Sequence, residues 1–535
     1  MTLGVRTDGD RLADAACAAM TLTVAAAPFE ATRPWAIWAW QSFSNLEVVL
    51  LAAIGGWGIT AAITRRMPAV SSPLTRPWVA LIAAAAIGAA VAPAWRANAW
   101  HMTARLGVAA VLCAMTVSIG ASARRQRVLL WTLCLSGAVV SGLAILEYLE
   151  LPWVLRTLRW FRPSTAYVGD QVRASGPLQY PTIASMYLEI CFAAGLGLLL
   201  SSIAAGQRLR AGMLFAVLAL GAEAIVLTFT RSGLIVIVVA LSIVGVCAVR
   251  RHGLTRGVAT LMLLAAVVAG EAMLSRPGEA LRLRLSSEGQ EGWYAAVFDA
   301  PATLTLPIGQ VSSIPVRLTN AGDAPWSSTG VPAFHASYHW LEDDVPRVVE
   351  WEGIRTRFPA PVVAGDTIDL EMRVYPPTMP GTYRLVWDIE QVDRLWFATE
   401  PDAQPSETRV RVEGAAVAPL SRTRPEYMPR QAVRPRRGLL WAAAGRMLRE
   451  RPITGVGLDN FRLLYGRDMP SRRADPRVHT NNLYLELVVG SGLLGAAALA
   501  WMVIRVAQAA WRAARRSDPL AWGAVAATAA IAVHG

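Results

Sequence analysis

The sequence predicts a mainly α-helical fold, a polytopic transmembrane bundle of about 11 spans with an inserted extracytoplasmic β-sandwich. Three observations lead to this prediction. Hydrophobic residues make up 54% of the 535 residues, charged residues make up only 17%, and the mean hydropathy is +0.38. The apolar residues gather in stretches of about 20, the length that crosses a bilayer. Between residues 291 and 414 the pattern changes to short runs separated by turn residues, which is typical of a β domain.

The apolar stretches define the two parts of the predicted bundle, residues 1–275 and 483–535. They lie near residues 12–28, 46–63, 78–95, 105–121, 127–147, 183–203, 211–229, 232–249, 257–275, 483–505 and 519–535. The first is short and contains Asp14, and Asp8 and Asp10 nearby argue against a cleavable signal peptide. The last stretch runs to residue 535 without a polar boundary, so we expect the second part of the bundle to be truncated.

Arginine clusters follow alternate spans, which brings all of them to one end of the predicted bundle. These clusters are Arg65-Arg66, Arg124-Arg125-Arg127, Arg208-Arg210, Arg250-Arg251 and Arg512-Arg515-Arg516. Loops rich in arginine stay on the cytoplasmic side of a membrane. We therefore expect a multi-pass protein of the cell inner (cytoplasmic) membrane, with residues 276–482 outside the cytoplasm.

The polar insertion divides into a linker at 276–290, a β-sandwich at 291–414 and a basic loop at 415–482. Alternating runs at 311–319 and 367–374, and the turn Pro380-Gly381 before the run 382–387, indicate antiparallel strands. Residues 291–414 hold nine Arg and eighteen Asp plus Glu, whereas residues 416–478 hold fourteen Arg and five acids. The basic loop either lies on anionic lipid headgroups or forms part of an anion site.

Three segments on the predicted outer side carry candidate functional residues. Arg173 precedes Gly176 and Pro181, so it either belongs to a turn that starts a helix or binds phosphate through its planar guanidinium. Arg231, in the turn 228–233, either extends to the headgroups or holds an anion. His479 precedes the span at 483 and can accept a proton near neutral pH, unless it serves as a capping or interfacial side chain.

The order of three motifs points to a family. They are Pro452-Ile453-Thr454-Gly455-Val456-Gly457, His479-Thr480-Asn481-Asn482-Leu483-Tyr484-Leu485-Glu486 and Gly492-Leu493-Leu494-Gly495. With the Arg173 segment and the turn Thr230-Arg231-Ser232-Gly233, they resemble the O-antigen ligase/polymerase superfamily, membrane enzymes that move glycans from polyprenyl-diphosphate carriers. The match differs in two places, because His479 lies two residues before the usual histidine position and Thr182 replaces the more usual Asn. Residues 316–326 and 380–383 also resemble an immunoglobulin-like (Ig-like) module.

The resemblance implies a metal-independent glycosyltransferase without a cofactor. His479 would deprotonate an acceptor hydroxyl, and Arg231 would neutralise the donor diphosphate. The substrate-binding residues that it implies are Arg173, Asn481, Asn482, Gly455, Gly457, Arg473 and Arg477. The implied partners are a polyprenyl-diphosphate-linked glycan, membrane lipids and a glycan, lipid or protein acceptor, with no nucleic acid.

Two other functions remain open from the sequence. A flippase or transporter for the same lipid-linked glycan would also have many spans, but it would normally contain internal repeats and broken helices. We find no repeat at matching positions. A glycan-binding sensor would use the sandwich as its functional part and the spans as an anchor, for which about 11 spans are excessive.

Overall fold

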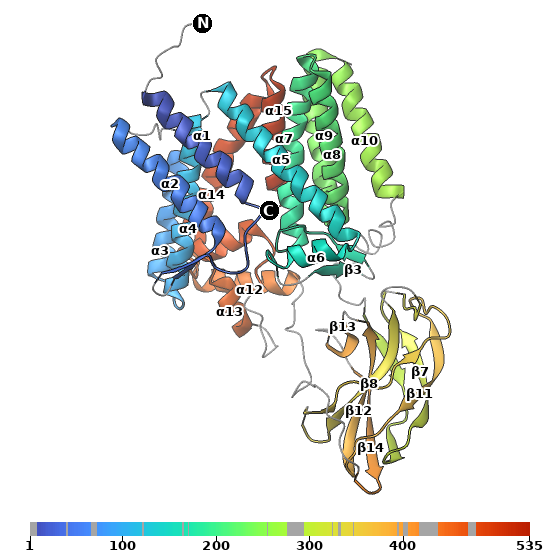
Figure 1. The fold of residues 1–535 in the computed structure, drawn as a ribbon. Coiled ribbons are helices and arrows are strands. Elements are labelled where there is room, and N and C mark those ends of the chain that lie inside the picture. The colour runs from blue at the N-terminus through green and yellow to red at the C-terminus, as the bar shows by residue number, and fades with distance from the viewer. Residues whose placement is uncertain are drawn as a thin grey trace. The chain divides into compact units, whose positions relative to one another are not determined.

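The computed structural model describes most of the chain, and its described residues form two compact units (Figure 1). One unit is built from the helices and the other from the strands between residues 296 and 413. The described residues are 8–38, 41–65, 72–119, 122–162, 165–168, 171–253, 255–274, 294–323, 325–329, 333–345, 347–392, 395–399, 405–416, 437–468 and 478–534. The predicted linker at 276–290, Arg473 and Arg477 lie outside these residues. The chain is mainly helical with a β domain, which confirms the coarse fold prediction.

In the described part of the helical unit, eleven long helices coincide with the predicted apolar stretches. They are α1 Asp8–Ala26, α2 Asn45–Thr64, α3 Thr75–Ala90, α4 Arg96–Ile119, α5 Ala123–Tyr148, α7 Pro181–Ala204, α8 Arg208–Leu227, α9 Arg231–His252, α10 Arg256–Leu274, α14 Leu483–Ala514 and α15 Pro519–His534. Short elements connect them: β1 Ala36–Trp38, β2 Gln41–Phe43, α6 Pro152–Leu158, β3 Ala166–Val168, β4 Gln171–Arg173, α12 Arg437–Glu450, α13 Phe461–Leu464 and the 3-10 helix η2 Tyr465–Asp468.

Among the described residues, seven helices are long and apolar enough to cross a membrane. These are α2, α4, α5, α7, α8, α9 and α14, whereas α3 and α15 are apolar but shorter. Apolar helices of this length indicate a membrane protein. The number of about 11 spans stays a prediction.

The two ends of the helical unit differ in character. The turns between α7 and α8, α9 and α10, and α14 and α15 lie at one end and are rich in arginine. There the Arg251 guanidinium donates a hydrogen bond to the carbonyl oxygen of Arg515, which ties α9 to α14. The other end carries α6, the β3–β4 hairpin, α12 and α13 (Figure 1). We call it the loop end, and all candidate site residues that the structure describes lie near it.

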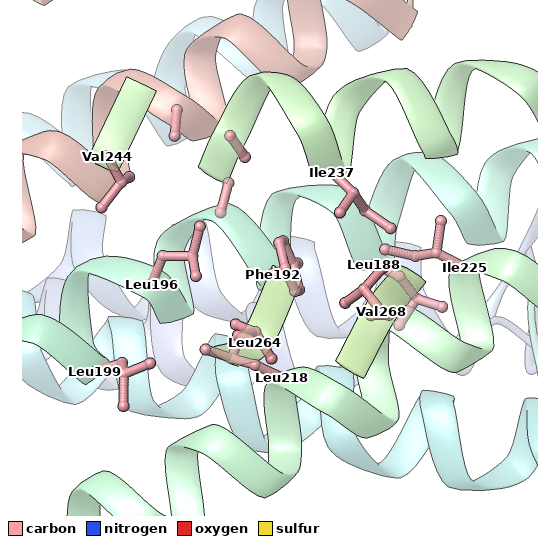
Figure 2. Close-up of a cluster of buried hydrophobic side chains, with 14 of the residues drawn as sticks. Leu188, Phe192, Leu196, Leu199, Leu218, Ile225, Ile237, Val244, Leu264 and Val268 are labelled. Carbon is pink, nitrogen blue, oxygen red and sulfur yellow. The ribbon is translucent and has the colours of Figure 1, made fainter. Parts of the chain in front are cut away.

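Helix α7 forms the centre of one half of the helical unit. Its span is 78% buried, against 11% for α2 and α4, so most of its faces contact protein. Figure 2 shows α7 side chains, among them Leu188, Phe192 and Leu196, against apolar side chains of α8, α9 and α10. On another face of α7, Gly197 lets α15 approach closely, since a Cβ there would lie 2.7 Å from the Pro519 carbonyl oxygen. Small residues allow this type of close helix contact in membranes.

The β unit consists of two sheets that share an aromatic core. Its strands are β5 Ala296–Asp299, β6 Thr303–Pro307, β7 Ser312–Asn320, β8 Phe334–Glu342, β9 Val348–Glu350, β10 Thr356–Arg357, β11 Thr367–Val374, β12 Gly381–Gln391, β13 Leu395–Trp396 and β14 Glu407–Glu413, with the 3-10 helix η1 Phe397–Thr399. One sheet has the order β10-β8-β12-β14-β6, with β9 beside β8 and β13 beside β12, and the other has the order β11-β7-β5. Fully buried Trp326, Trp340 and Trp387 contribute to the core.

The strand pairing differs from the antiparallel prediction at one edge. In this unit's described strands, β14 and β6 pair in parallel, whereas the remaining ladders are antiparallel. β5 belongs to the smaller sheet and β6 to the larger one, so the chain crosses between the sheets after β5. β6 then runs beside β14, in the same direction as β14. The alternation predicted at 367–374 is confirmed, since β11 covers these residues and alternates between exposed and buried positions.

A buried histidine joins three segments of the β unit. His339 Nε2 lies 2.9 Å from Asp388 Oδ2, and its Nδ1 lies 2.6 Å from the Trp351 carbonyl oxygen. Both partners are acceptors, and Asp388 Oδ1 also receives the N–H groups of Ile389 and Ala398. The His339 ring stacks on Trp351 with ring centroids 3.7 Å apart. Both ring nitrogens of His339 therefore have hydrogen-bond partners within the fold, so we assign His339 a structural role.

We predict that His339→Leu destabilises the β unit by about 3 kcal/mol, because it leaves the Asp388 carboxylate buried without its partner. Thermal unfolding of the whole protein, followed by protease sensitivity within residues 294–416, measures the effect. The control is Arg317→Ala, which removes an ion pair with Asp369 whose two side chains are 60% and 76% exposed. Equal unfolding temperatures for the two variants would contradict the structural role of His339.

Candidate active site

The apolar helix α14 is interrupted at Gly492, whose backbone has φ 65° and ψ −161°. A break frees carbonyl and N–H groups, which apolar surroundings leave unsatisfied at high cost. Here the irregular segment 452–457 forms hydrogen bonds with four of these groups. The bonds are Val456 N to Val489 O at 3.0 Å, Gly457 N to Gly490 O at 3.0 Å, Leu493 N to Pro452 O at 2.8 Å and Leu494 N to Ile453 O at 3.2 Å. Segment 452–457, which forms one of the sequence motifs, therefore contacts α14 on both sides of Gly492, where the motif 492–495 begins.

The glycines at 455 and 457 are required by this contact. Gly455 has φ 67°, and a Cβ there would collide with the Val489 carbonyl oxygen. Gly457 has φ 96°, and a Cβ would lie 2.6 Å from Asn460 Nδ2 and 2.9 Å from Ala99 Cβ. Both positions need the left-handed backbone that glycine adopts without strain. The substrate-binding role that the resemblance implies for these two glycines stays a prediction, because their geometry is fully accounted for by packing.

A polar network follows the glycine segment and ties it to the start of α4. Asp459 accepts hydrogen bonds from Arg462, at 2.9 and 2.7 Å, and from Asn98 Nδ2, at 3.1 Å. Burial by itself would raise the pKa of Asp459, but the hydrogen bonds from Arg462 and Asn98 outweigh it, so the pKa is lowered. Asp459 is therefore ionised at neutral pH. The fully buried Asn460 amide donates to the carbonyl oxygens of Ala94 and Val456.

His479 lies beside two carboxylates. Its Nδ1 is 3.5 Å from Glu486 Oε1 and 3.9 Å from Asp459 Oδ1, and the ring is 47% exposed. The interaction with Glu486 raises the pKa of His479, and burial opposes it. Because Nδ1 faces the carboxylates, Nε2 is the atom available to a substrate. The imidazole therefore lies at ion-pair distance from two acidic side chains.

The residues between His479 and α14 hold its first turn. Asn482 caps the helix, since its Oδ1 accepts the Leu485 N–H at 2.8 Å. Asn481 has φ 54°, a left-handed conformation that Asn tolerates better than most residues. Thr480 N donates to Glu486 Oε2 at 3.0 Å, which fixes the carboxylate that faces His479. The structure therefore accounts for Asn482 and Asn481 locally, and their predicted contact with substrate is still untested.

The Arg173 segment covers the turn between α8 and α9. Ala174 N donates to the Leu227 carbonyl oxygen at 3.0 Å, and Arg173 Nε donates to the Thr228 carbonyl oxygen at 3.1 Å. Thr228 and Phe229 are fully buried beneath it. These contacts bring Arg173 to the turn that contains Arg231, although the two are distant in sequence.

A buried ion pair positions the Arg173 segment. Arg162 and Glu147 form a salt bridge with side-chain exposures of 2% and 0%. Glu147 Oε2 also accepts the N–H groups of Ser175 and Gly176, at 3.0 and 2.7 Å. This carboxylate connects the end of α5 to the residues just after Arg173. Removing either charge would leave the other buried without compensation.

Arg231 begins α9 and is half-buried. Within the described residues it forms no salt bridge with a carboxylate. The residues around Arg231 are linked to those around His479 through α15. Tyr484 OH donates a hydrogen bond to the Ala532 carbonyl oxygen at 3.2 Å. Both clusters belong to the helical unit and lie near its loop end.

Sequence reasoning did not identify Asp459 and Glu486 as neighbours of His479, or Asn98 as a partner of Asp459. No sequence signal connects Asn98 to Asp459, since 361 residues separate them. Among the described residues, no group of three or more His, Cys, Asp and Glu side chains could hold a metal ion.

No protein-family model, no curated protein and no solved structure matches the chain. The resemblance to the O-antigen ligase/polymerase superfamily and to an Ig-like module thus depends on the motifs alone.

We predict that Gly455→Ala destabilises the helical unit by about 2 kcal/mol or more, because the new Cβ meets the broken part of α14 and the backbone has positive φ. Thermal unfolding of the purified protein in detergent checks this. Gly445→Ala in α12 is the matched control, since a Cβ there meets nothing within 4 Å and helix propensity favours alanine. A Gly455→Ala variant as stable as Gly445→Ala would show that the contact at the break is dispensable.

Proposed function

We propose that the protein is a membrane glycosyltransferase of the O-antigen ligase type. It transfers or polymerises a glycan from a polyprenyl-diphosphate carrier onto an acceptor hydroxyl at the outer face of the cytoplasmic membrane. The observation that carries the proposal is the position of His479 between Glu486 and Asp459, in the same unit and near the same end as Arg231. A base and an unpaired cation are the two groups that such a transfer needs.

The reaction assigns one role to each cluster. The acceptor oxygen attacks the anomeric carbon of the donor sugar, and the bond from this carbon to the diphosphate oxygen breaks. The acceptor proton passes to His479 Nε2, which faces away from the carboxylates. The polyprenyl diphosphate leaves with both bonding electrons, and Arg231 stabilises the charge that it gains. Arg173, held at the α8–α9 turn, would add a second guanidinium to this side.

The proposed sidedness rests on the arginines at the short turns of the opposite end. Arg124, Arg208, Arg250 and Arg515 lie at or beside helix ends away from α6 and α12. By the positive-inside rule that end would face the cytoplasm and the loop end would face outward. A lipid-linked donor would then meet the site from the membrane, while the acceptor would approach from the aqueous side.

A flippase for the same lipid-linked glycan is the second candidate. The break of α14 at Gly492 favours it, since transporters often build their binding sites from interrupted helices. Here the groups freed at the break are bonded to segment 452–457, which leaves them unavailable to a substrate. This bonding favours a rigid scaffold over a moving gate, and we therefore rank the transferase first.

We predict that His479→Ala lowers the transfer rate by about 100-fold or more, the usual contribution of a general base. Donor binding should stay unchanged, because Arg231 is intact. Arg231→Ala should instead weaken both donor binding and transfer. Purified protein, a polyprenyl-diphosphate glycan and a panel of glycan, lipid and protein acceptors provide the assay.

The controls are His101→Ala on α4 and Arg156→Ala on α6, both exposed residues of matched type. Full transfer in His479→Ala and Arg231→Ala would remove the proposed site. Translocation of the glycan without transfer by the wild-type protein would identify the flippase instead.

The pH dependence should report on Glu486. Only the neutral imidazole accepts a proton, so transfer should rise as the pH passes upward through the pKa of His479. The interaction with Glu486 raises that pKa, and Glu486→Gln should therefore move the midpoint to lower pH. Glu450→Gln, an exposed residue of α12, should leave the midpoint in place.

The same pKa shift has a stability consequence of defined sign. The folded pKa of His479 is raised, so the stabilisation from Glu486 is present at low pH and is lost as the pH rises through that pKa. Unfolding temperatures of the wild type and Glu486→Gln should differ more at low pH than at high pH. A constant difference across the pH range would contradict the assigned pairing.

A further inference from the structure

A second imidazole–carboxylate pair lies beside the start of α9. His534 Nδ1 on α15 is 3.0 and 3.1 Å from the two carboxylate oxygens of Glu189 on α7. The Glu189 side chain is fully buried and that of His534 is 10% exposed. The pair connects α7 to α15, which run side by side in the helical unit (Figure 1).

Two serines complete the cluster. Ser185 Oγ donates to Glu189 Oε1 at 2.6 Å, and Ser232 Oγ lies 3.2 Å from His534 Nδ1. All contacts that the described residues make with the His534 ring nitrogens therefore go to Nδ1. The carboxylate accepts the Nδ1 proton, and this bond fixes the ring and leaves Nε2 for another partner.

Gly233 brings the start of α9 onto this cluster. A Cβ at Gly233 would lie 2.6 Å from Ser185 Oγ and 3.4 Å from Glu189 Oε1. Only glycine permits the first turn of α9 to approach α7 so closely. The sequence Arg231-Ser232-Gly233 is thus one unit, in which Gly233 sets the approach, Ser232 contacts His534 and Arg231 carries the charge.

The charges around the cluster indicate an anionic ligand. The buried Glu189 carboxylate lies 3.0 Å from His534 Nδ1, and an imidazole that carries both ring protons donates from both nitrogens. In that form the Nδ1–H bonds to Glu189 and the Nε2–H is a donor for a ligand. Arg231 adds a positive charge without a described carboxylate partner, and α9 starts here without a side-chain cap. A helix start favours anions through its N–H groups, and Ser232 Oγ at this helix start lies 3.2 Å from His534 Nδ1.

We propose that His534 donates a hydrogen bond from Nε2 to a phosphate of the lipid-linked diphosphate, and that Glu189 is the positioning residue that holds this ring. The proposal deepens the proposed function and rests on it for the identity of the ligand as a polyprenyl diphosphate. His479 and His534 then have separate roles, the first toward the acceptor hydroxyl and the second toward the leaving group.

The test measures binding of an undecaprenyl diphosphate without sugar to the purified full-length protein in detergent. His534→Ala should weaken binding roughly tenfold or more, as expected for loss of a hydrogen bond to a charged group. Glu189→Gln should weaken it less, and His534→Gln should retain most of it, because the Gln amide can replace the donor. His101→Ala is the control and should bind like the wild type.

Two further ligands distinguish headgroup from tail and lipid-bound from free phosphate. Undecaprenol, which lacks phosphate, should bind the wild type and His534→Ala equally. Inorganic pyrophosphate that competes in the wild type but not in His534→Ala would assign the site to the phosphates themselves. Equal loss of undecaprenol and diphosphate binding in His534→Ala would overturn the proposal, as would diphosphate binding equal to that of the wild type.

Kinetics separate this proposal from the proposed function. In an active enzyme, His534→Ala should raise the KM for the donor more than it lowers kcat, whereas His479→Ala should lower kcat. A wild-type protein that binds the diphosphate through His534 but transfers no glycan would refute the transferase and keep the phosphate site. Normal transfer with an unchanged donor KM in His534→Ala would refute the phosphate site and keep the transferase.

Discussion

The contact between segment 452–457 and the break in α14 is the constraint on which the candidate site depends. An interrupted apolar helix is unstable unless other groups bond its freed backbone, and four hydrogen bonds from one segment do this here. This hydrogen bonding requires glycine at 455 and 492, because the backbone is left-handed there and the two segments nearly touch. Helix α3 also packs closely against this contact, since a Cβ on Gly88 would lie 2.7 Å from the Thr454 carbonyl oxygen.

This contact determines the positions of the polar residues around His479. Asp459 follows the bonded segment by two residues, and Glu486 precedes the break by six, so the contact determines where both carboxylates lie. His479 lies between these two carboxylates, in the segment before α14. Under the proposed function, such fixed carboxylates would provide the preorganisation that electrostatic catalysis requires.

Much of the fold could be predicted from the sequence, because long apolar runs and alternating strands are local signals. The helices at α7 and α14 and the strand β11 follow directly from such patterns. The pairs that build the site are not local. His534 and Glu189 are 345 residues apart, and each looks like an isolated polar residue at a predicted span. Their partnership depends on how α15 packs on α7, which a single sequence does not reveal.

The distribution of charge distinguishes a binding site from a set of structural pairs. Glu147 with Arg162, Asp459 with Arg462, and Glu189 with His534 each combine one acid with one base, so these pairs are internally balanced. Among the described residues, Arg231 has no such acidic partner. It lies at a helix start, which also favours anions. In a half-buried position such an excess charge is unfavourable unless a ligand neutralises it. Under the proposed function, the diphosphate of the lipid-linked donor would supply the neutralising charge.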